Sequence, residues 1–169
     1  MTTAKSTFVS NLDNVPVIKN DRVAAGAPIL TAFVTAEGQS VTSGAALRMF
    51  RLPSRAVLFR LEMATDDLGA SSDPDVGLYY AINNPASPAG AVIDADNFAS
   101  AVDTSGQAYA RTDITDESGV VAIENRGKQL WARAGLSSDP GGDFDICLTP
   151  GATITATVAI WVSYVLADA

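Results

Sequence analysis

The sequence contains no histidine and a single cysteine, and these two shortages limit the chemistry that the chain can carry. Without histidine it lacks the commonest general base, the base of a serine triad and the usual zinc ligand. The one cysteine, Cys147, cannot form an internal disulfide, and its place in the apolar run DICL predicts a buried side chain. These shortages disfavour catalysis by histidine or cysteine and a zinc site. We expect no catalytic residues, no metal and no cofactor, with alternatives that use carboxylates alone considered below.

Positive charge and long apolar runs are also scarce. Eleven basic residues stand against nineteen acidic ones, which gives a net charge of −8, and no run of Lys or Arg offers the charge cluster that phosphate backbones require. The longest apolar stretch, residues 152–169, is interrupted by hydroxyl residues and falls short of the roughly 18 apolar residues of a membrane span. The N-terminus lacks the basic and apolar regions of a secretory signal. We expect binding to neither nucleic acid nor membrane.

The residues that are abundant favour strands. Hydrophobic residues make up 47% of the chain and charged residues only 18%, which indicates a folded protein, and Val, Ile, Ala and Thr favour β-structure. Strands are predicted at residues 28–34, 45–52, 56–64, 76–82, 144–150 and 153–166. The two-residue period places Val57, Phe59, Leu61 and Met63 on one face of their strand. In the last strand it places Ile154, Ala156, Val158, Ile160, Val162 and Tyr164 together.

Two short helices are predicted in the connections. Residues 92–102 have Asp94 or Asp96 as a possible N-cap, and residues 121–134 are followed by Gly135 as a C-terminal stop. Six to eight strands with one or two short helices predict a mostly β fold, a β-sandwich or jelly roll. We divide the chain into an extended N-terminal arm, residues 1–27, and a single β-sandwich domain, residues 28–169.

The tetrapeptide Ser-Ser-Asp-Pro occurs twice, at residues 71–74 and 137–140, and each copy precedes a predicted strand. Asp and Ser side chains bond to nearby backbone amides and Pro fixes the next φ, so we favour a pair of turns. Asp139, Asp143 and Asp145 lie close enough in sequence to offer two alternatives. One is a calcium loop, although the ligand spacing is irregular, and the other is the carboxylate pair of a glycosidase.

Aromatic residues leave a further choice open. Trp131 and Trp161, together with Tyr79 and Tyr80, could form a sugar-stacking surface. Trp131 falls in the second predicted helix and Trp161 in the last strand, which favours packing in the core or at an interface.

Several segments in order resemble small structural proteins of tailed bacteriophages: DVGLY, VIDADNFAS, LWARAGLSSDP and a final YV, all within residues 45–165. The resemblance implies a non-enzymatic decoration or cement protein, made in the host cytoplasm, that sits on the outside of the capsid and bridges major capsid protein subunits. It also implies self-association on the capsid lattice. A tail or head-to-tail component and a host-glycan-binding module remain the alternatives, with a carboxylate-based hydrolase behind them.

Residues 1–27 mix isolated apolar residues with chain breakers and have no period. Such a segment buries little by itself, but it can lie extended across a neighbouring subunit and pair with its backbone. A first edge strand folded back on its own domain is the alternative. The predicted capsid contacts are Phe8, Val9, Leu12, Val15, Val17 and Ile18.

Overall fold

The structure, a computed structural model, describes residues 27–69, 72–82, 84, 90–104, 108–117 and 119–167. Eight strands make up most of it: β1 (Leu30–Val41), β2 (Leu47–Pro53), β3 (Ala56–Thr65), β4 (Asp75–Tyr80), β5 (Val92–Ala99), β6 (Tyr109–Asp113), β7 (Asp143–Thr149) and β8 (Ile154–Leu166). A 3₁₀ turn, η1 (Ile123–Asn125), and one helical turn, α2 (Leu130–Arg133), lie between β6 and β7.

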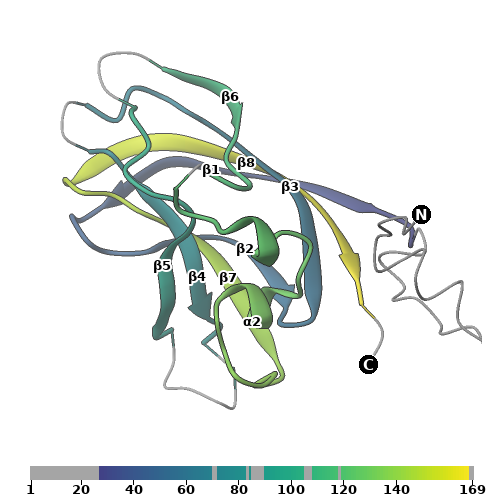
Figure 1. Cartoon of the computed structure of the whole chain (residues 1–169). Helices are drawn as coiled ribbons and strands as arrows, with labels where there is room; N and C mark the ends of the chain where they lie inside the picture. The colour runs from purple at the N-terminus through teal and green to yellow at the C-terminus, as the bar shows by residue number, and fades with distance from the viewer. Residues whose placement is uncertain are drawn as a thin grey trace, which may run out of the picture.

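The strands form two antiparallel sheets of four. Sheet A has the order β1-β8-β3-β6 and sheet B the order β2-β7-β4-β5. The pairing is nested, because β1 pairs with β8, β2 with β7, β3 with β6 and β4 with β5. The start of β1 and the end of β8 therefore lie side by side at one end of the sandwich (Figure 1). The predicted β-sandwich is confirmed.

The core lies between the sheets and uses the alternation seen in the sequence. Five residues of β8 point inward and are buried: Ile154, Ala156, Val158, Ile160 and Val162. Opposite them, β7 contributes Phe144, Ile146 and Leu148, which are fully buried. At the end of β8 the alternation changes, since Tyr164 is half-buried and Val165 is buried.

The change coincides with a β-bulge in the neighbouring strand. Leu58 pairs with Tyr164 and Arg60 with Ser163, so Phe59 is the extra residue of β3. Phe59 is 45% exposed. The prediction that Val57, Phe59, Leu61 and Met63 share one face is therefore wrong. Phe59 is exposed, and Leu58 packs in the core with Leu61 and Met63 in place of Val57.

The two predicted helices are largely wrong. Residues 92–99 form β5, whose pairing with β4 contains two register shifts that hide the strand alternation. The segment 121–134 is helical only in η1 and α2, because Gly127 between them has a φ of 75°, outside the helical region. Strand β6 was not predicted. The division between an arm and a domain concerns residues 1–26, which lie outside the described residues, and it stays a prediction.

Candidate interaction surface

The second Ser-Ser-Asp-Pro segment is held as a turn by its aspartate. The Asp139 carboxylate accepts hydrogen bonds from the Ser54 hydroxyl (2.6 Å) and the Gly141 amide (2.9 Å), and it pairs with Arg55. Burial raises the pKa of Asp139, but these hydrogen bonds lower it more, so it lies below the usual value. In the first segment Ser72 is fully buried and its hydroxyl donates to the Gly69 carbonyl. The contacts of Asp139 and Ser72 agree with the turn interpretation.

Asp145 does not belong to the turn. It is a buried residue of β7 on the outer face of sheet B, where it accepts hydrogen bonds from Arg48 Nη1 and Arg51 Nε, both at 2.6 Å. Burial raises the pKa of Asp145, but the two arginines more than offset this and hold it below its usual value. A shallow pocket of about 400 Å³ opens beside this cluster. This pairing could not be predicted from the sequence, since the two arginines lie more than 90 residues from Asp145.

These contacts bear on the two alternative interpretations of the acidic loops. A glycosidase general acid needs a raised pKa, whereas the pKa values of Asp139 and Asp145 are both lowered. Within the described residues, no three His, Cys, Asp or Glu side chains come together in a group that could hold a metal ion. Cys147 is buried, and burial raises its thiol pKa to about 12, so the thiol is inert at neutral pH.

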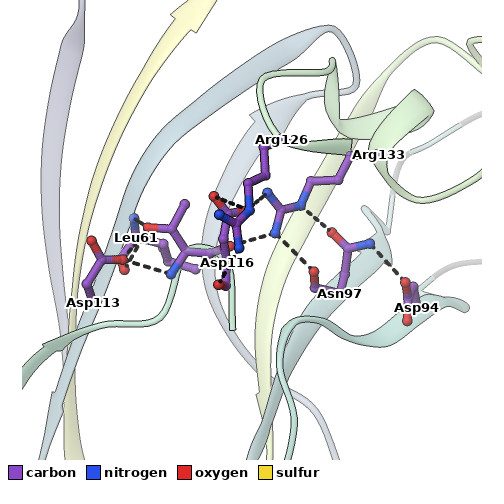
Figure 2. Close-up of polar contacts among 8 residues, drawn as sticks. Leu61, Asp94, Asn97, Asp113, Asp116, Arg126 and Arg133 are labelled. Atoms are coloured by element: carbon purple, nitrogen blue, oxygen red, sulfur yellow. Dashed lines mark hydrogen bonds and ion pairs between the residues drawn. The ribbon is translucent and has the colours of Figure 1, made fainter. Parts of the chain in front are cut away.

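A buried arginine joins the two sheets at the edge where β5 and β6 lie. The Arg133 side chain is only 2% exposed. Its guanidinium donates to Asp116 (2.7 Å), to the carbonyl of Thr115 (2.6 Å) and to the side chain and carbonyl of Asn97 (3.0 and 3.1 Å). Figure 2 shows it between Asp116 on one side and Asn97 on the other. We call this set of contacts the Arg133 brace.

The brace links the sheets because its partners come from both. Asn97 belongs to β5 of sheet B, whereas Thr115 and Asp116 follow β6 of sheet A. The guanidinium also lies 4.7 Å from the centre of the Phe98 ring. All four of these hydrogen bonds are made to the protein's own groups. The brace is therefore a structural element, and the sequence contains no pattern that would have predicted it.

Trp161 forms the centre of an exposed cluster on the outer face of sheet A. The Phe33 ring on β1 lies 4.8 Å from its ring, and the Arg111 guanidinium from β6 lies 4.4 Å from it. Below Arg111, the Glu62 carboxylate is nearly buried and pairs with Arg60 and Arg111. Because Phe33 and Arg111 approach from opposite sides of β8, the indole is packed on both sides. This arrangement favours the packing role of Trp161 over sugar stacking.

Exposed apolar side chains gather at the end of sheet A where β1 begins and β8 ends. The large ones are Ile29, Leu30, Phe33, Phe59 and Leu166, each more than 40% exposed. We call these five residues the apolar end of sheet A. Clustered apolar side chains on a surface mark contact sites more often than scattered ones do. This end is our candidate interaction surface.

The predicted capsid contacts Phe8, Val9, Leu12, Val15, Val17 and Ile18 all lie outside the described residues. The chain enters the described part at residue 27, immediately before the apolar end of sheet A. No helix in the described part is long and apolar enough to cross a membrane.

The fold is shared with a protein of a phage particle. A chain in a structure of the capsid of Ralstonia phage GP4 aligns with a TM-score of 0.53 and 16% identity, covering 84% of this chain and 86% of that one. A chain of the cyanophage Pam1 capsid asymmetric unit aligns with a TM-score of 0.41 and 12% identity, over 80% and 83% of the two chains. No protein-family model and no curated protein matches the sequence. At 16% identity, the GP4 alignment establishes a common fold.

Proposed function

We propose that this protein is a non-enzymatic structural protein of a phage particle, which decorates or cements the outside of the capsid by bridging major capsid protein subunits. The observation that carries the proposal is the fold shared with a chain of the GP4 capsid over more than four fifths of both chains. The ordered sequence segments that resemble phage structural proteins support it independently.

The strand order supports a virion role as well. Nested pairing of β1 with β8, β2 with β7, β3 with β6 and β4 with β5 is the order that results when one long hairpin folds over on itself. We infer that the sandwich is a jelly roll, an architecture used by viral capsid and lectin domains. A lectin binds sugars, and the indole of Trp161 is already packed against Phe33 and Arg111. This packing favours the role in a capsid over the role of a lectin.

Charge and apolar surface fit the exterior of a capsid. A net charge of −8 keeps a protein soluble at the high local density of a particle surface. The apolar end of sheet A offers a contact face, and each contact can be weak because a lattice repeats it many times. We propose that the surface of the protein outside this contact face is exposed to solvent on the particle.

We further propose that the N-terminal arm makes the main contact with the capsid. Phe8, Val9, Leu12, Val15, Val17 and Ile18 would be buried against a neighbouring subunit, next to the apolar end of sheet A. Ordering the arm costs roughly 1 to 2 kcal/mol per residue, so apolar burial and new backbone hydrogen bonds must offset that cost.

The test uses particles that lack this protein. Purified full chain is added to them, and its occupancy and position are measured by cryo-electron microscopy. We expect density on the outer capsid surface between capsid subunits, and a higher melting temperature of the decorated particles. Density confined to the tail or the head-to-tail junction would contradict the proposal and favour that alternative.

The arm is tested by deleting residues 2–20. The truncated protein should keep nearly the same melting temperature as the full chain, while its occupancy on particles falls sharply. A control replaces Ile123, an exposed residue of η1, by Ser, which should leave occupancy unchanged. If the truncated protein unfolds, or decorates particles as well as the full chain does, the arm does not make the main contact with the capsid.

A further inference from the structure

Among the described residues, strand β1 forms a free edge of sheet A, and the first seven residues of this strand lack the usual protection. Within the described residues it pairs with β8 alone, at the edge of sheet A, and its pairing from Leu30 to Ala36 is regular. Residues 27–36 include no charged side chain, and the only proline, Pro28, precedes the strand. Edge strands expose unpaired N–H and C=O groups and are normally protected by charge, proline, bulges or short length.

The other three edges carry such protection. Strand β6 has five residues and includes Arg111 and Asp113. Strand β2 is interrupted by a bulge at Met49 and ends at Pro53. Strand β5 has two register shifts in its pairing with β4. Strand β1 has a register shift between Ala36 and Gln39 and contains Glu37, so its own protection is confined to its second half. The regular, uncharged first half, Leu30 to Ala36, is therefore the part of this edge that can accept a partner strand.

The residues of β1 are complementary to a second copy of the same strand. When two copies pair antiparallel about Phe33, Thr31 lies opposite Thr35, Ala32 opposite Val34, and Leu30 opposite Ala36. Residues that face each other then point to the same side of the sheet, as antiparallel pairing requires. Glu37 lies opposite Ile29, so no two charges meet, although each chain carries a net charge of −8.

Phe33 adds an aromatic contact to this register. It is 57% exposed and already stacks on Trp161. In the paired state its ring meets the Phe33 ring of the second copy, which creates a row of four aromatic side chains across the outer face. Aromatic and Thr–Thr cross-strand pairs are both favourable in antiparallel sheets.

We propose that two copies of this protein associate through antiparallel pairing of β1 with β1 about a two-fold axis at Phe33, which joins the two A sheets into one sheet of eight strands. The occupant of the edge is a second copy of the chain. Seven paired residues bury less than a standard interface, so the dissociation constant is expected to be on the order of micromolar or weaker. The pairing occurs in the free protein and does not depend on the capsid role.

The experiment measures the mass of the full chain by sedimentation equilibrium over a wide range of concentration. The wild type should show a monomer–dimer equilibrium. The variant Thr31→Lys/Thr35→Lys places two Lys–Lys pairs across the axis and should weaken the dimer by roughly tenfold. The variant Thr31→Lys/Thr35→Glu places each Lys opposite a Glu of the other copy and should restore it.

Two controls separate pairing from folding. Both exposed threonines can be replaced without disturbing the core, which circular dichroism and melting temperature verify for each variant. Thr155→Lys adds a positive charge to the same outer face on β8, away from the edge, and should leave the dimer intact.

Several results would overturn the inference. These are a wild type that stays monomeric at millimolar concentration, a closed trimer, or equal behaviour of the Lys/Lys and Lys/Glu variants. A monomer that dimerises only after deletion of residues 2–20 would show that the chain's own N-terminal segment covers the edge. A monomer whose Lys/Lys variant loses occupancy on particles would assign the edge to a capsid strand instead. A dimer that fails to bind particles would contradict the proposed function and leave this inference intact.

Discussion

Replacing Arg133 by Met should destabilise the protein strongly. The change keeps the aliphatic part of the side chain but removes four hydrogen bonds, and it leaves the carbonyls of Thr115 and Asn97 without their donor. Breaking a buried ion pair costs about 3–5 kcal/mol. Asp116 is 25% exposed and keeps a contact with Arg126 at 3.7 Å, so we expect the lower end, about 3 kcal/mol.

For a chain of this length, 1 kcal/mol shifts the melting temperature by about 2–4 °C, so the expected decrease is roughly 6–12 °C. The measurement is differential scanning calorimetry at neutral pH, supported by urea unfolding. Arg126→Met is the matched control, because Arg126 contacts the same Asp116 from a side chain that is 44% exposed. Exposed pairs contribute at most about 1 kcal/mol, so this variant should melt within a few degrees of the wild type. Equal melting temperatures for the two variants would refute the idea that Arg133 braces the sheets.

Three other substitutions test the core, a close backbone approach and an ion pair. Ile160→Asp buries an unpaired charge and should abolish soluble folding. Thr155→Asp, on the exposed face of the same strand, should express normally. Equal yields of soluble protein from the two variants would contradict the assigned faces. Gly77→Ala places a methyl carbon about 2.2 Å from the backbone of Ala95. It should lower the free energy of unfolding, measured by chemical denaturation, by roughly 1–3 kcal/mol. An unchanged denaturation midpoint would count against this contact. Because the pKa of Asp145 is lowered in the folded state, its contribution to stability is present above the unfolded-state pKa of about 4 and is lost as pH falls through the folded-state value. Unfolding free energies measured between pH 2 and pH 7 should therefore fall less steeply in acid for Asp145→Asn than for the wild type, and parallel curves would show that this carboxylate does not couple folding to pH.

The strands that could be predicted are those whose side chains alternate without interruption. In β8, Ile154 through Val162 are buried at every second position, and one face of apolar residues is enough to predict both strand and face. The alternation fails where a neighbouring strand contains a bulge. Phe59 looks like a core residue in the sequence, but the bulge turns its side chain to the surface.

The parts that could not be predicted depend on contacts between distant residues. Residues 92–99 form a strand because β4 lies beside them, although Phe98 and Val102 are spaced as on a helix. Asp145 was considered only as part of a calcium loop or a carboxylate pair, because its partners Arg48 and Arg51 are distant in sequence. Arg133 had no assigned role, since a buried arginine looks the same in a sequence as an exposed one.

The position of β8 in sheet A has a consequence for synthesis of the chain. This strand lies between β1 and β3, yet it is made after the other seven strands. Until it leaves the ribosome, β1 lacks the one strand it pairs with among the described residues, and β3 lacks one of its two neighbours. The sandwich therefore cannot form step by step during translation, and a premature stop before residue 154 leaves a product that chaperones and proteases should recognise as unfolded.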